Sequence, residues 1–153
     1  MKNYFLRLFT FDNWANNLII KSLEENNIND ERIVRILSHV AHAQHNWYYR
    51  FIKPQNDVPV WDVLSFKENA VRFEENGKLW LHAIETMREE DLTIPLSYLN
   101  LKKEPNMDTV QDVFAHVVNH ASYHRGQVIY LIRECGFTPP ATDFIIFARK
   151  YPL

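Results

Sequence analysis

The sequence predicts an all-α protein, a four-helix bundle with a long irregular connection before the fourth helix. Four long stretches carry apolar residues three and four positions apart, the spacing that places them on one face of an α-helix. Glycine, which weakens helices, occurs only three times in 153 residues. We find no internal repeat, low-complexity tract or linker, so residues 1–153 are expected to form a single domain.

The first two predicted helices cover residues 4–25 and 30–53. Asp30 is a suitable N-cap for the second helix, because its carboxylate can accept a hydrogen bond from the backbone of the first turn. Pro54 ends this helix, since proline cannot continue the hydrogen-bond pattern. The predicted apolar faces consist of Leu8, Phe11, Ala15, Leu18 and Ile19 in the first helix, and Ile33, Ile36, Val40, Ala43, Trp47 and Phe51 in the second.

The third and fourth predicted helices cover residues 65–90 and 108–134. The third has apolar residues alternately four and three apart, the pattern of a helix packed in a bundle. Gly136 suits the left-handed position that follows the end of a helix. The apolar positions of the third helix are Phe66, Ala70, Phe73, Gly77, Trp80, Ile84 and Met87.

The connection before the fourth helix covers residues 92–107, and residues 93–101 within it have the composition of an extended segment, one arm of a short hairpin. After Pro140, Thr142 and Asp143 are expected to cap a short final helix at residues 144–150.

Charge and composition exclude several classes of partner. A net charge of -2 and a pI near 6.4 argue against nucleic-acid binding, which usually requires a basic surface. There is no block of like charge for an anionic membrane, and no apolar run reaches the ~18 residues that a membrane-spanning helix needs. The single cysteine excludes an internal disulfide, and the N-terminus lacks the apolar run of a signal peptide. We therefore expect a cytoplasmic protein.

The fourth predicted helix carries three histidines at four-residue spacing, His116, His120 and His124. Since a helix turns about 100° per residue, His116 and His124 lie about 40° on either side of His120, and Gln127 lies about 20° from it. Val113, Val117 and Leu131 share this sector, so the histidines are expected to point inward, where unbound imidazoles cost free energy. Residues i and i+4, about 6 Å apart, suit two ligands of one metal ion. His116 and His124 are about 12 Å apart along the axis, so the pair is either His116 with His120 or His120 with His124.

The second predicted helix carries His39, His42 and His45. Relative to Val40 at the centre of its apolar face, His39 lies about 100° away, His45 about 140° and His42 about 160°. We therefore predict His39 as the third ligand and solvent-facing positions for the other two, as also for His82 in the third helix. A single histidine on an apolar face is more often a core residue than a ligand. The three histidines of the fourth helix are what favours a metal.

Residues 119–127, Asn-His-Ala-Ser-Tyr-His-Arg-Gly-Gln, closely resemble the H-x-x-x-H-R-G-Q signature of the DinB (damage-inducible) / YfiT-like metalloprotein superfamily. Residues 11–16, residues 37–40 with Trp47, and residues 139–149 resemble further segments of that superfamily, so the likeness covers essentially the whole chain. One difference is that residues 100–104 lack the glycine that many relatives carry in the turn before the fourth helix.

The resemblance implies a four-helix bundle with one long crossover, a homodimer, and one divalent metal ion held by three histidines. Carried onto this sequence, the ligands are His39, His120 and His124, which selects His124 over His116. Some relatives transfer low-molecular-weight thiols such as bacillithiol or glutathione to electrophiles, whereas others resemble hydrolases or isomerases.

Three neutral imidazoles leave a divalent ion with open positions, as in catalytic zinc sites. Such an ion lowers the pKa of a bound water from about 16 to about 7, or deprotonates a bound thiol. Gln127, His116 and Asn119 are candidates for the groups that orient the ligands. All-nitrogen ligation suits several metals; zinc and nickel are our first candidates, and iron, manganese or cobalt the next. A di-iron carboxylate centre is disfavoured, because no Glu-x-x-His pair occurs.

These observations predict a DinB-like metal-dependent enzyme, resembling a thiol S-transferase or a hydrolase, that acts on a small molecule. Arg125 is expected to point off the apolar face and to pair with a carboxylate. The alternative is a non-catalytic, metal-stabilised module for stress-related binding or dimerisation. A bundle with core histidines and no metal is the third possibility.

Overall fold

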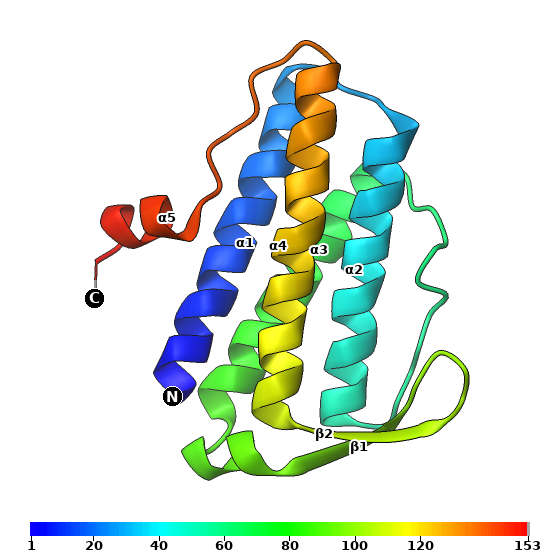
Figure 1. Ribbon diagram of the computed structural model, residues 1–153, viewed down its shortest axis with the longest axis vertical. Helices are drawn as coiled ribbons and strands as arrows, with labels where there is room; N and C mark the ends of the chain where they lie inside the picture. Colours follow the sequence, from blue (N-terminus) through cyan, green and yellow to red (C-terminus); the bar gives the residue numbers. More distant parts are fainter. Residues whose placement is uncertain (153) are drawn as a thin grey trace.

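A computed structural model describes residues 1–152, and within them the chain is mostly helical with a small two-stranded sheet. Four long helices lie side by side (Figure 1), with α1 and α2 each packed against both α3 and α4. The elements in chain order are α1 (Lys2–Glu25), α2 (Glu31–Ile52), α3 (Phe66–Thr86), the 3-10 helix η1 (Glu89–Thr93), β1 (Pro95–Leu99), β2 (Pro105–Thr109), α4 (Val110–Glu134) and α5 (Phe144–Lys150). None of the helices in the described part of the chain combines the length and apolar content needed to cross a membrane.

Local capping interactions define several helix ends, but not the start of α5, where the predicted cap residue Asp143 makes no side-chain hydrogen bond to the helix. The Asp30 carboxylate accepts a hydrogen bond from the backbone N–H of Arg32, so the predicted N-cap of α2 is confirmed. Ser65 caps α3 in a reciprocal pair with Glu68. Beyond α4, Gly136 adopts a φ of 84°, the left-handed conformation expected there.

The predicted end of the third helix at residue 90 is wrong, because α3 stops at Thr86. Met87 turns into an extended conformation, with ψ of 159°. The Asp91 carboxylate then accepts hydrogen bonds from the backbone and guanidinium of Arg88, which starts the separate turn of η1.

The extended segment expected before the fourth helix is confirmed as strand β1, which pairs antiparallel with β2. The turn between them has no glycine, and Lys103 adopts a φ of 63° at the position that glycine would favour. The Asn100 side-chain oxygen accepts from the backbone N–H groups of Lys102 and Glu104, which stabilises the turn.

The long connection was predicted before the fourth helix. In the structure, the connection that runs the length of the fold lies between α2 and α3. Helices α2 and α3 run in the same direction, so residues 53–65, here called the strap, return along the outside of α2 (Figure 1). The Asn46 side chain exchanges two 2.8 Å hydrogen bonds with the backbone of Val58. Arg50 forms a buried ion pair with Asp57.

Burial of His42 contradicts its predicted solvent-facing position. His42 is 4% exposed and His45 is half-buried, because the strap covers the side of α2 opposite the core. Burial and then the positive charge of Arg72 lower the pKa of His42. His82 is exposed as expected.

A polar layer separates two apolar core clusters. The Arg125 guanidinium donates 2.8 Å hydrogen bonds to the side-chain oxygens of Asp12 and Asn16, and Gln44 donates to the same Asp12 carboxylate. The predicted pairing of Arg125 with a carboxylate is therefore confirmed, although the guanidinium is buried in the core. One cluster includes Phe5, Phe9, Trp80 and Phe114, and the other Ile19, Leu23, Ile33 and Ile132.

Candidate metal centre

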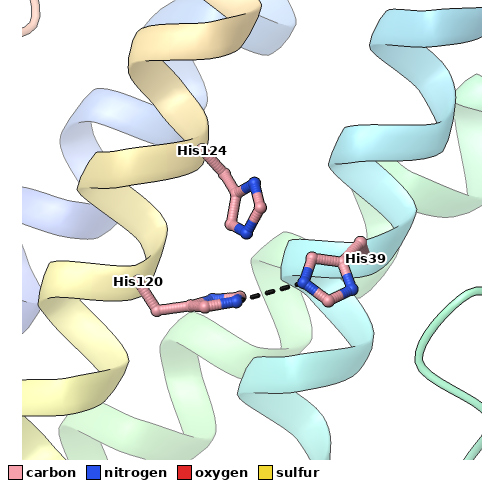
Figure 2. A group of neighbouring side chains, drawn as sticks. All are labelled: His39, His120 and His124. Carbon is pink, nitrogen blue, oxygen red and sulfur yellow. Dashed lines mark hydrogen bonds between the residues drawn. The ribbon is translucent and has the colours of Figure 1, made fainter.

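Three histidines from two helices converge on one point between α2 and α4. His39 comes from α2, and His120 and His124 come from successive turns of α4 (Figure 2). The nitrogens that they direct toward one another lie within 4.8 Å, and the Nε2 atoms of His39 and His120 are 3.1 Å apart. We call these three residues the triad; each is half-buried.

The outer nitrogens of two of these rings are held by hydrogen bonds. Nδ1 of His39 lies 3.1 Å from the backbone oxygen of Val60, in the strap. Nδ1 of His124 lies 2.8 Å from the side-chain oxygen of Gln127, one turn further along α4. Because both oxygens are acceptors, each Nδ1 carries the proton, and each Nε2 keeps a lone pair for a ligand bond.

Electrostatics favours neutral rings in this centre. Burial, followed by the neighbouring His124, His39 and His116, lowers the pKa of His120 to about 3. Burial also lowers the pKa of His39, although the Val60 carbonyl opposes this effect. Neutral imidazoles are the form that binds metal ions, so neither ring would have to lose a proton first.

The donor set fits a divalent ion. Zinc–nitrogen bonds of 2.0–2.1 Å in a tetrahedral site place neighbouring ligand nitrogens about 3.4 Å apart. The 3.1 Å between His39 and His120 is close to that separation. No fourth histidine, cysteine or carboxylate joins the group among residues 1–152. An ion held by the triad would therefore keep at least one position for water or another molecule.

The other predicted site residues lie at different distances from the triad. The Gln127 side chain contacts His124 directly. His116 is exposed; its ring centre is 5.6 Å from that of His120 and 5.2 Å from that of Trp47. Asn119 is exposed, and its side chain makes no hydrogen bond within the described chain. The structure thus brings His124, not His116, together with His39 and His120.

Sequence reasoning missed two aromatic residues that border the triad. Trp61 in the strap stacks on His39, with ring centres 3.9 Å apart and planes inclined by 13°, and is 53% exposed. Tyr123 approaches His124 edge-on at 5.0 Å. The strap has no helical or strand periodicity, so nothing in the sequence placed Trp61 beside His39.

Comparisons with known proteins identify the family of this chain and support its fold. The sequence pattern of the DinB family matches residues 5–151. Protein DinB of Bacillus subtilis is 26% identical over 163 aligned positions, which cover 96% of this chain and 95% of that protein. The crystal structure of a DinB-like protein from Bacillus cereus superposes with a TM-score of 0.70 at 19% identity, over 90% of this chain and 94% of that one, which supports the fold alone. Because the family pattern spans nearly its whole length, the chain belongs to the DinB family.

Proposed function

We propose that this protein is a metal-dependent enzyme that binds a divalent ion through His39, His120 and His124 and acts on a small molecule. The observation that carries the proposal is the convergence of three imidazole nitrogens within 4.8 Å, without a fourth protein ligand among residues 1–152. Structural zinc sites usually have four protein ligands, whereas catalytic sites keep a position open. We propose that the reaction is either a thiol transfer or a hydrolysis.

The chain's own residues orient the rings of the triad and exclude water from one side of it. Val60 and Gln127 hold the rings of His39 and His124 so that their Nε2 atoms face the common centre. Trp61 covers one face of His39 and limits the approach of water from that side. A divalent ion, when bound, would supply Lewis acidity that lowers the pKa of a water or thiol at the open position.

We assign zinc or nickel as the first candidates for the ion and iron, manganese or cobalt as the next, because nitrogen ligands accept all of these metals. In the thiol-transfer form of the proposal, one of the substrates is a low-molecular-weight thiol. We further propose a four-helix bundle that functions as a cytoplasmic homodimer, without nucleic-acid or membrane partners.

Elemental analysis of the purified protein tests the metal. The wild type should carry about one ion per chain, and His120→Ala should lose it because one of three ligands is removed. His82→Ala is the matched control, since His82 is exposed on α3 and lies outside the triad. A wild-type protein that takes up no divalent metal after incubation with zinc or nickel would refute the proposal.

Activity is tested separately with the metal-loaded protein. A panel that combines low-molecular-weight thiols with electrophiles, together with ester and amide substrates, should show turnover that His120→Ala abolishes and His82→Ala retains. Turnover that is equal in the two variants would show that the reaction does not use the triad.

A non-catalytic role is the second candidate, and the origin of the ligands favours it. Because they come from α2 and α4, an ion would join two helices that are distant in sequence. This role predicts that a chelator lowers the melting temperature of the wild type but not of His120→Ala, while no substrate in the panel is turned over.

A further inference from the structure

A groove of about 750 Å³ lies beside the triad, between the first turns of α2, the end of the strap and the start of α3. Its apolar walls include Val34, Val63 and Leu64. Trp61 also lines the groove, and the same indole stacks on His39 at 3.9 Å. The volume is within the range of small-molecule sites. The groove and the triad therefore share one aromatic wall.

Arg35 provides the groove with a positive charge. It precedes His39 by one turn of α2, about 6 Å along the axis. Its guanidinium carbon lies 5.6 Å from the centre of the Trp61 ring. Arg35 is exposed and forms no ion pair with a carboxylate within residues 1–152, whereas the neighbouring Arg32 is bound to Asp30 and Glu134.

We propose that this groove binds the carboxylate-bearing part of the substrate, with Arg35 pairing with the carboxylate and Trp61 covering the apolar atoms next to it. A guanidinium forms two parallel hydrogen bonds with a carboxylate, which fixes direction as well as position. The Trp61 ring is contacted by both Arg35 and His39, so a molecule that lies along this indole would reach both the guanidinium and the triad. The inference rests on the proposed function, because the triad is where the other end of the molecule reacts.

Glu31 restricts the charge of this ligand. It lines the same groove in the first turn of α2, one turn before Arg35. A second negative charge on the ligand would be repelled by this carboxylate. The site therefore suits a molecule with a single carboxylate in contact with Arg35.

Two thiols that differ only in charge provide the test. N-acetylcysteine carries a carboxylate, and N-acetylcysteine amide is neutral; both are titrated into the protein loaded with cobalt(II), whose absorption changes when a thiol coordinates. The wild type should bind the acid about tenfold more tightly than the amide, the lower end of the effect of a hydrogen bond to a charged group. Arg35→Met, which keeps the apolar part of the side chain, should lose this preference and keep its affinity for the amide.

Arg133→Met is the matched control, because Arg133 is exposed in the last turn of α4 and does not line the groove. It should retain the preference for the acid. Equal affinity of the wild type for the two thiols, or a preference that persists in Arg35→Met, overturns the groove assignment and leaves the proposed function intact. Failure of the protein to bind cobalt, zinc or nickel overturns the proposed function together with this inference. Bound cobalt that responds to neither thiol overturns the inference and the thiol-transfer form of the function.

Discussion

Replacing Asn46 by alanine should loosen the strap and thereby weaken metal binding at a distance. Asn46 is 2% exposed, and its amide both donates to and accepts from the backbone of Val58 at 2.8 Å. Val60, two residues further along the strap, holds Nδ1 of His39, and Trp61 stacks on the same ring. Asn46→Ala removes the anchor without altering any residue of the triad.

The magnitude of the loss follows from these contacts. Each of the two hydrogen bonds contributes about 1 kcal/mol net, and the half-buried backbone groups of Val58 would lose their partners. We therefore expect the free energy of unfolding of the metal-free protein to fall by about 2–3 kcal/mol. Groups that orient a ligand from outside the coordination sphere are worth about 10–100-fold in metal affinity. Because Asn46→Ala loosens the strap but leaves Val60 in place, we expect the lower limit, a loss of about tenfold.

Urea unfolding measures the first quantity, and competition with a chromophoric zinc chelator measures the second. Asn76→Ala is the matched control: Asn76 is 1% exposed and donates a 2.8 Å hydrogen bond to the α2 backbone at Ala41, away from the strap. It should destabilise the protein by about 1–2 kcal/mol and leave zinc affinity unchanged. The reasoning would be refuted if Asn46→Ala lost stability as expected but bound zinc as tightly as Asn76→Ala.

Three further substitutions test the polar layer, the α2 cap and the hairpin turn. Arg125→Met leaves the buried Asp12 carboxylate without its cation and should lower the free energy of unfolding by about 3–5 kcal/mol in urea titrations; a change below 1 kcal/mol would contradict the role of this pair. The Arg32 guanidinium lowers the pKa of Asp30 to about 2, so the charged pair adds stability above pH 4 that is lost as the pH falls through 2. Asp30→Asn keeps the cap acceptor and should be less stable than wild type by about 1 kcal/mol at pH 7 but equal to it near pH 2; a difference independent of pH would exclude this linkage. Lys103→Gly relieves the left-handed conformation at a φ of 63° and should raise stability by about 0.5 kcal/mol, whereas a decrease would show that the lysine is not strained.

Most features that depend on neighbouring residues were predicted from the sequence, and those that depend on distant ones were not; the end of α3 is the local exception. The caps at Asp30 and Gly136 act within a single turn, so their residue types identify them. The end of α3 was misplaced because Glu89 and Glu90 are good helix formers, and only the side chain of Asp91 shows why the chain restarts as η1.

In the candidate site, too, local features were predicted and contacts between distant segments were not. His120 and His124 were recognisable because their spacing is a local property of one helix. Periodicity alone left His116 equivalent to His124, because the choice depends on which turn of α4 faces His39. That choice required the family resemblance. Gln127 was identified from its position on the helix, whereas Val60 contributes a backbone carbonyl, which no residue type can indicate.

The prediction that His42 faces solvent was wrong because the strap covers this side of α2. Ser38, His42, Asn46 and Arg50 follow one another at four-residue intervals along α2, and such a polar row usually faces solvent. In the structure, three of the four bind the strap: Ser38 accepts from the backbone of Leu64, Asn46 binds Val58, and Arg50 binds Asp57.

The length of the connection that follows α2 determines whether such a polar row faces solvent or is covered by a returning segment. Helix α2, with 22 residues, is about 33 Å long. Residues 53–65 without regular structure can span about 40 Å when extended, enough to return along the whole helix. A connection of that length allows the following helix to run in the same direction, and its backbone needs hydrogen-bond partners wherever it is covered. The polar side chains of α2 are those partners, so in this protein the row that resembles a solvated face is the surface that fixes the strap and, through Val60 and Trp61, the ring of His39.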